Sequence, residues 1–334
     1  IKALLNIPIF WIIHTLIFGL VFINKSFSDL IFQNFLHQII FQIIIIITCI
    51  YIIKFNMLKE FVILNFYLLS LMMMVHFILC IDEISFSNIK NIMSATKRTR
   101  AAFGFNHYNA LGELCICSIF LWIYKKKFHN KKIDYIFIII SIVMLLCSAS
   151  RSSFTGLILF LVVLIYYKIV HKLNNKSKIF VKLLVIILFG GLLVYFNSLD
   201  INMILKESQR NIIFETAIPV WISSGRLLIG LGYASNMSYG TNLTPYDIRW
   251  LDNGYAYILV STGIIGSLIY ALFIKKVFKG INQSNNKIIK AFLCTYMYIS
   301  CFEVALFQSG IFINYIISII MFTDIIINKQ EEKK

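Results

Sequence analysis

Long continuous apolar runs, separated by short polar segments, dominate the chain from Ile7 to Asn328. The runs do not alternate between apolar and polar positions, so the pattern is that of helices crossing a bilayer and not of the strands of a membrane barrel. A backbone inside lipid must satisfy its own hydrogen bonds, which helices do. The pattern therefore predicts an all-α, polytopic membrane helical bundle.

The runs predict about ten membrane-spanning helices, several near the short end of the usual ~17–25 residues. The expected spans are 7–23, 38–53, 61–80, 109–124, 133–148, 154–168, 179–196, 255–274, 291–307 and 311–328. They form a single integral membrane domain, 1–334, with a long connection, 197–254, between spans seven and eight. A connection of this length is a functional region and not a mere turn. The chain begins with Ile1 and not with Met, so a further span before Ile1 is an open alternative.

Lysines set the expected orientation of these spans, because cytoplasmic connections normally carry the positive charge. The connections after spans two, four, six and eight are lysine-rich, as is the C-terminal tail. Only Lys25, Lys90, Lys97 and Lys206 fall in the other connections. We therefore expect both termini in the cytoplasm and the long connection on the outer face. This topology explains the net charge of +16 without nucleic acid, and affinity for membrane lipids follows from it.

All seven cysteines lie within apolar runs, where cysteine usually acts as a small hydrophobic residue. Cys115 and Cys117 are close in sequence, but a helix points them to different faces, which makes a poor metal pair. The cysteines therefore indicate no disulfide framework and no metal site. No cofactor is expected.

The arginines follow the opposite distribution from the lysines. All six fall in the outer connections: Arg98, Arg100, Arg151, Arg210, Arg226 and Arg249. A guanidinium is a fixed, forked cation that suits a phosphate or a diphosphate. The outer face is therefore the side on which we expect chemistry.

Other outer residues are candidates too, and each has a structural alternative. Arg151, in a turn of small residues, either binds an anionic ligand or snorkels to lipid headgroups. Asp252 and Asn253 precede span eight, where a carboxylate can engage a hydroxyl and where both residues also favour a helix N-cap. His107 precedes span four, either as a base or sugar ligand or as an interfacial histidine beside Tyr108.

Ionisable residues inside the expected spans are functional suspects by default. They are few: His14, His76, Glu113, Glu303 and Asp324. Glu303 is expected in the middle of span nine, with a structural or cavity role. A proton-coupled transporter would usually need more such groups.

Several segments, in order, resemble the motifs of the O-antigen polymerase and O-antigen ligase superfamily of bacterial membrane glycosyltransferases. Segment 148–152 is similar to the family's S-R-G turn, and segment 210–233 to its loop arginine followed by a G-x-G. Segment 252–266 is similar to its H/D-N-x-Y motif at the start of a span that ends G-x-x-G. Segment 103–109 resembles the F-G-F-x-H-P-N motif of capsular polymerases, with Tyr108 in place of proline.

The resemblance implies a GT-C-like glycosyltransferase of the bacterial cytoplasmic (inner) membrane. Such an enzyme polymerises undecaprenyl-diphosphate-linked oligosaccharide repeat units into O-antigen or capsule on the outer face. Asp252-Asn253 stands where ligases typically carry His-Asn, which favours the polymerase over the ligase. A flippase for lipid-linked oligosaccharides and a non-catalytic scaffold are the alternatives from other classes. The implied partners are the lipid-linked oligosaccharides, a chain-length regulator and a flippase.

The resemblance also implies roles for individual residues. Arg151 and Arg210 would bind the diphosphate leaving group and stabilise its charge. Asp252 or His107 would engage the acceptor hydroxyl. The further substrate-binding residues would be Arg100, Arg226, Arg249, Asn253 and Tyr255.

Overall fold

The computed structural model describes residues 2–20, 29–85, 100–105, 107–170, 218–232, 253–284, 286–303, 307 and 312–331. Regular structure in these ranges is helical throughout, without a strand. The helices are α1 (Lys2–Leu20), α2 (Asp29–Phe55), α3 (Leu58–Leu79), α5 (Tyr108–Lys125), α6 (Ile133–Ser148), α7 (Arg151–Val170), α10 (Ile218–Ser223), α11 (Gly254–Gln283), α12 (Lys287–Ile299) and α13 (Phe312–Glu331). A short 3-10 turn, η1 (Ile81–Glu83), follows α3.

The helices confirm a helical membrane protein at the coarse level. Four helical stretches are long and apolar enough to cross a membrane: Phe35–Phe55, Leu58–Leu79, Arg151–Ile169 and Gly254–Gln283. Shorter apolar stretches occupy α1, α6 and α13. Expected span seven, 179–196, lies outside the described residues. The count of about ten spans and the GT-C-like fold stay predictions.

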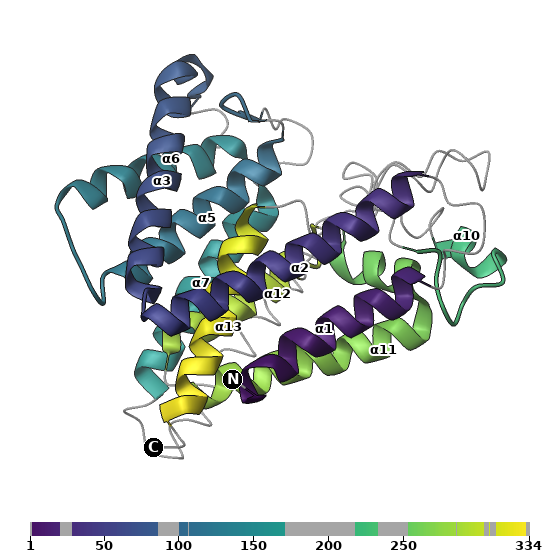
Figure 1. Cartoon of the computed structure of the whole chain (residues 1–334). Coiled ribbons are helices and arrows are strands. Elements are labelled where there is room, and N and C mark those ends of the chain that lie inside the picture. Colours follow the sequence, from purple (N-terminus) through teal and green to yellow (C-terminus); the bar gives the residue numbers. More distant parts are fainter. Residues whose placement is uncertain are drawn as a thin grey trace.

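The helices pack as two groups joined by a central layer (Figure 1). On one side α5 packs on α3, α6 and α7, and on the other α1 packs on α11. Between them, α12 packs on α7 and α13 packs on α2. Helices α1 and α11 are antiparallel, since His14 Nε2 lies 3.0 Å from Gly266 O while Phe10 lies under Lys276, nearer the end of α11.

An aromatic cluster fills the junction of α1, α11 and α13. Trp11 stacks on Phe273 at 5.5 Å between ring centroids, and Phe307 stacks on Phe322 at 5.7 Å. All four side chains are buried. Each such aromatic pair contributes roughly 0.5–1.5 kcal/mol beyond its area of burial.

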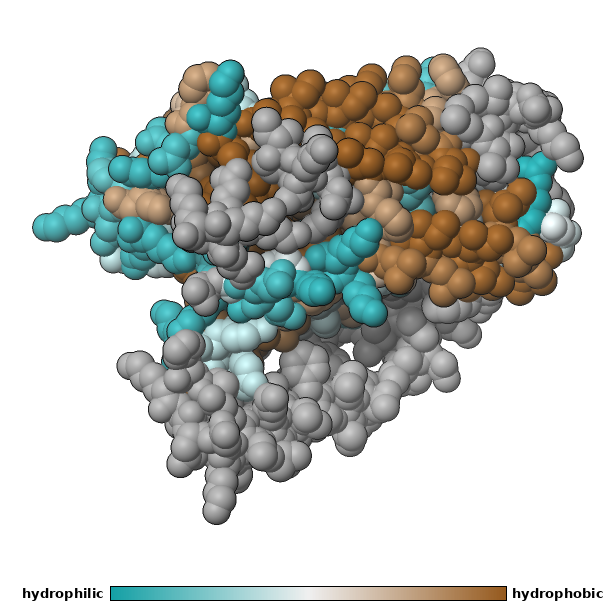
Figure 2. Space-filling model, turned by 60° about the horizontal axis from the view of Figure 1, so that its bottom comes forward, coloured by the Kyte–Doolittle hydropathy of each residue, from teal (hydrophilic) through white to brown (hydrophobic). Residues whose placement is uncertain are grey.

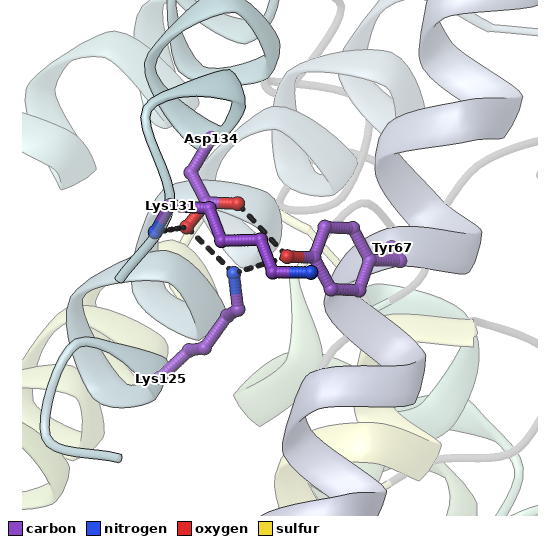
Figure 3. Close-up of polar contacts among 4 residues, drawn as sticks. All are labelled: Tyr67, Lys125, Lys131 and Asp134. Carbon is purple, nitrogen blue, oxygen red and sulfur yellow. Dashed lines mark hydrogen bonds and ion pairs between the residues drawn. The ribbon is translucent and has the colours of Figure 1, made fainter. Parts of the chain in front are cut away.

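A buried ion pair joins α3, α5 and α6 (Figure 3). It lies at the end of the helices that carries the lysine-rich connections, which we call the lysine-rich end. Lys125 Nζ lies 2.6 Å from Asp134 Oδ2, and neither side chain is exposed. The Tyr67 hydroxyl accepts from Lys125 at 2.9 Å and donates to Asp134 Oδ1 at 3.1 Å. The backbone N–H of Lys131 donates to Asp134 Oδ2 at 3.0 Å. Lys125, which sequence analysis assigns to a charged loop, is therefore an interior structural residue.

A second polar network at this end explains Asp324 of α13. The Asp324 carboxylate accepts from Ser284 Oγ at 2.6 Å and from Asn286 Nδ2 at 3.1 Å. Lys127 Nζ donates to Asn286 Oδ1 at 2.6 Å. These bonds tie the connection between α5 and α6 to the connection between α11 and α12. Asp324 thus holds helix ends together.

Candidate functional site

The segment 101–105 is fixed against the end of α3 by two ionisable side chains. The backbone N–H groups of Ala102 and Phe103 both donate to Glu83 Oε2 at 2.8 Å. His76 Nδ1 lies 2.8 Å from the carbonyl oxygen of Phe103, so Nδ1 carries the proton. Phe103 and Gly104 have φ of 47° and 73°, which turns the chain sharply here. His76 therefore has a structural role in the F-G-F segment.

Arg100 and His107 both lie against the ring of Tyr108. The Arg100 guanidinium carbon is 3.9 Å from the centroid of this ring, and the His107 ring is 4.2 Å from it. His107 is the N-cap of α5, and its Nδ1 accepts from the N–H of Asn109 at 3.2 Å. In neutral His107 the proton therefore sits on Nε2, which is then a hydrogen-bond donor.

The turn that carries Arg151 lies directly beside this segment. The N–H of Ala101 donates to the carbonyl oxygen of Cys147 at 3.1 Å. Helix α6 then ends at Ser148, Ala149 adopts a left-handed conformation with φ of 47°, and α7 begins at Arg151. Arg151 is half-buried at the first position of a long apolar helix.

The serines of this turn are buried, and the turn packs against α5. Ser150 Oγ donates to Ser153 Oγ at 3.0 Å. Gly112 of α5 packs so closely on the turn that a Cβ there would lie 2.5 Å from Ser153 Oγ. The small residues of the S-R-G-like motif therefore allow a close helix crossing just behind Arg151.

Asn253 and Tyr255 both use their polar groups within the protein. Asn253 is the N-cap of α11, and its Oδ1 accepts from the N–H groups of Tyr255 at 3.0 Å and Ala256 at 2.9 Å. Its Nδ2 donates to the carbonyl oxygen of Cys301 at 2.8 Å. The Tyr255 hydroxyl donates to Met297 O at 3.0 Å. The N-cap alternative for Asn253 is therefore the observed geometry, and a sugar would have to contact the Tyr255 ring or the exposed edge of the cap.

Glu303 connects two of the motif segments, and it was not among the predicted site residues. Its Oε1 accepts from Ser152 Oγ at 3.3 Å, and its backbone oxygen accepts from the N–H of Gly254 at 3.0 Å. Helix α12 ends at Ile299, so Glu303 lies in the turn beyond the helix and not in the middle of a span. The apolar run simply continues past the helix end, which explains the wrong placement. The sequence feature that could have identified Glu303 is a lone carboxylate in an apolar run.

The G-x-G segment docks into a break in α11. Gly263 has φ of 67° and ψ of −170°, which interrupts the helix inside expected span eight. Four backbone bonds replace those that the break removes: Leu231 N to Val260 O at 2.8 Å, Gly232 N to Ser261 O at 2.8 Å, Ile264 N to Leu227 O at 2.9 Å and Ile265 N to Leu228 O at 3.1 Å. Irregular backbone at membrane depth is tolerated where protein satisfies it in this way. The apolar run predicts an unbroken span here and gives no sign of the break.

Arg226 begins the turn that leads into this docked segment. Its N–H donates to Ser224 Oγ at 3.2 Å, and its carbonyl oxygen accepts from the N–H of Gly230 at 2.8 Å. The carbonyl oxygen of the next residue, Leu227, accepts from the N–H of Ile264, which is roughly 16 Å along α11 from Asn253 at about 1.5 Å per residue. Arg226 therefore lies beside the break in α11, away from the Asn253 cap.

The remaining predicted residues, Arg210, Arg249 and Asp252, lie outside the described residues, and their roles stay predictions. Of the long connection 197–254, the structure describes 218–232 and 253–254. The described ranges contain no group of three or more His, Cys, Asp or Glu residues that could hold a metal ion.

Comparisons of the chain with protein-family models, with curated proteins and with solved structures give no match. The resemblance to the O-antigen polymerase and ligase superfamily therefore rests on the motif segments alone.

Proposed function

We propose that the protein is a membrane glycosyltransferase that polymerises polyprenyl-diphosphate-linked oligosaccharide repeat units at the outer face of the cytoplasmic membrane. One observation carries the proposal. The described residues of segments 103–109 and 148–152 and of the start of segment 252–266, which resemble three separate family motifs, lie near one another at one end of the helices. Ala101, next to the first segment, donates to Cys147, next to the second, Gly112 packs on Ser153, and Glu303 bonds to both Ser152 and Gly254.

The proposed reaction needs a cation at the leaving group and no metal. A hydroxyl of the acceptor attacks the anomeric carbon of the donor, the bond from that carbon to the diphosphate oxygen breaks, and the lipid diphosphate leaves. Asp252 takes the proton of the hydroxyl. Arg151, with Arg210 from the long connection, stabilises the charge that develops on the diphosphate. His107 Nε2–H donates to a sugar oxygen, and the Tyr255 ring supports the sugar.

The other end of the helices favours this reaction over transport. A flippase needs a polar route that opens to both sides of the membrane. Lys125, Asp134 and Tyr67 satisfy one another there, and both members of the ion pair are fully buried. Of the described arginines, Arg100 and Arg151 belong to the opposite end, and Arg226 lies beside the break in α11.

The test is the glycan made by a deletion strain that carries single variants on a plasmid. Arg151→Lys keeps the charge and loses the forked pair of N–H donors. We therefore expect glycan of one repeat unit and a rate of polymerisation lower by roughly 30- to 1,000-fold, the effect of about 2–4 kcal/mol of transition-state stabilisation. Lys132→Arg, at the lysine-rich end, is the control and should give normal polymer. Equal membrane levels are checked by immunoblot.

The same strain separates the rival functions. Precursor that accumulates on the cytoplasmic face of the membrane would indicate a flippase. Full-length polymer that stays on the carrier lipid would indicate a ligase. Normal polymer in the Arg151→Lys strain, at a normal protein level, would remove Arg151 from the reaction and the proposal with it.

A further inference from the structure

A small open cavity lies between α1 and α11 at the lysine-rich end of the helices. Its volume is about 260 Å³ and its lining is Phe10, Leu272, Lys275, Lys276 and Lys279. Among the residues that the structure describes, no carboxylate belongs to this lining. The cavity therefore joins an apolar floor to a concentrated positive charge.

Helical spacing places the three lysines around one mouth. Lys275 and Lys279 are four residues apart on α11, so their side chains leave the same face of the helix. Lys276 turns toward α1, where its Nζ lies 4.1 Å from the centroid of the Phe10 ring. Leu272 precedes Lys275 and Lys276 by one turn. The charge thus lies at the end of an apolar strip.

The apolar strip continues along the surface of α11 toward the middle of the membrane. Leu272 is 51% exposed and Leu268, one turn earlier, is 63% exposed. Figure 2, in which the bottom of the Figure 1 view comes forward, shows a broad hydrophobic surface bordered by hydrophilic patches. A ligand that fills both parts has an anionic head and an apolar chain running along the helix.

Charge complementarity decides which ligand this is. Three neighbouring ammonium groups repel one another, and a phosphate offsets that repulsion. Near a membrane surface, anionic lipids are the phosphate source at the highest local concentration, and lysines there attract them. A zwitterionic lipid brings its own cation and gains less.

We propose that this cavity binds the phosphate of an anionic phospholipid of the adjoining leaflet, with an acyl chain along Leu272 and Leu268. The site is independent of the proposed glycosyltransferase reaction, because its residues belong to the other end of the helices. It fixes one lipid at the seam between α1 and α11.

The experiment is native mass spectrometry of the full chain in detergent with equal amounts of phosphatidylglycerol and phosphatidylcholine. The wild type should retain one phosphatidylglycerol in preference. Replacing Lys275, Lys276 and Lys279 together with Gln should lower that retention by roughly 10- to 100-fold. The matched control replaces exposed Lys59, Lys131 and Lys132 with Gln, which removes the same charge and should change little.

Two further arms keep the test decisive. The Lys→Arg triple at 275, 276 and 279 preserves the charge and should retain the lipid, which separates lost binding from lost folding. Leu272→Ser should also weaken retention. Equal losses in the two Gln triples, equal retention of phosphatidylcholine, or displacement of the lipid by millimolar inorganic phosphate would each overturn the proposal.

Discussion

Gly230 and Gly263 pack backbone against backbone, with no room for a side chain on either. A Cβ on Gly263 would lie 2.5 Å from the amide nitrogen of Gly230, and a Cβ on Gly230 would meet Gly263 as closely. Both residues also have positive φ, 77° and 67°. This contact is what lets the segment 227–232 supply the hydrogen bonds that α11 lacks at its break.

Alanine at Gly230 or Gly263 should therefore destabilise the protein strongly. The left-handed conformation alone costs about 1–2 kcal/mol, and the clash with backbone adds to it because backbone cannot turn aside. Thermal unfolding in detergent measures the change. Gly225→Ala is the matched control, since Gly225 has φ of 67° but nothing within 4 Å of the added Cβ. Equal unfolding temperatures for Gly263→Ala and Gly225→Ala would contradict the docking of segment 227–232 against Gly263.

Lys125 and Asp134 should depend on each other. Lys125→Met leaves the Asp134 carboxylate buried without its cation, which we expect to cost about 3–5 kcal/mol of unfolding free energy. The double variant Lys125→Met with Asp134→Leu removes both charges and should recover most of that loss. The coupling free energy is obtained from the unfolding free energies of Lys125→Met, Asp134→Leu and the double variant. Lys132→Met, at an exposed lysine, is the control. Additive losses in the double variant would show that the pair has no mutual role.

Ala149 should tolerate glycine and reject β-branched residues. It is fully buried and left-handed, so Ala149→Gly relieves the backbone and stays within about 1 kcal/mol of the wild type. Ala149→Val adds volume and a stiff side chain to the same position and should cost at least about 2 kcal/mol. Thermal unfolding distinguishes the two. Equal stability of both variants would mean that the turn before Arg151 is not held in this conformation.

Glu303 should act on the proposed reaction by positioning the Ser152–Arg151 turn. Glu303→Gln keeps an oxygen that accepts from Ser152, so polymer formation should stay within about 3-fold of the wild type. Glu303→Ala removes the acceptor, and we expect a loss of at least about 10-fold, since a buried donor left unsatisfied costs about 1–3 kcal/mol. Glycan length and membrane level are measured together. A Gln variant as poor as the Ala variant would assign the role to the negative charge.

Much of the fold followed from the sequence because hydropathy acts locally. The expected spans 109–124 and 133–148 coincide with α5 and α6 to within a few residues. The hydropathy pattern gave a wrong prediction where an apolar run continues beyond the end of its helix. Glu303 follows the end of α12 inside a continuing apolar stretch, so composition alone placed it in a span.

The site was less predictable, because it depends on contacts between distant segments. Gly263 in span eight gave no sign that Leu227 would bond to Ile264, or Leu231 to Val260, beside a break in the helix. For Asn253 the sequence allows a chemical role or a helix N-cap, and for His107 a chemical role or an interfacial position beside Tyr108. Both residues are N-caps in the structure. Local spacing cannot choose between these, since the same residue types serve caps and ligands.

The orientation of the helices can be tested with two introduced cysteines in a Cys301→Ser background, which removes the exposed native thiol. Ser223→Cys lies in α10, within the long connection that we expect outside, and Lys132→Cys lies at the opposite, lysine-rich end. Both positions are exposed. A membrane-impermeant maleimide on intact spheroplasts should label Cys at 223 and not at 132, and permeabilised cells should label both. Because the positive-inside argument fixes every connection at once, the reverse result would invert the whole topology and place Arg151 on the cytoplasmic side, where the proposed reaction has no substrate.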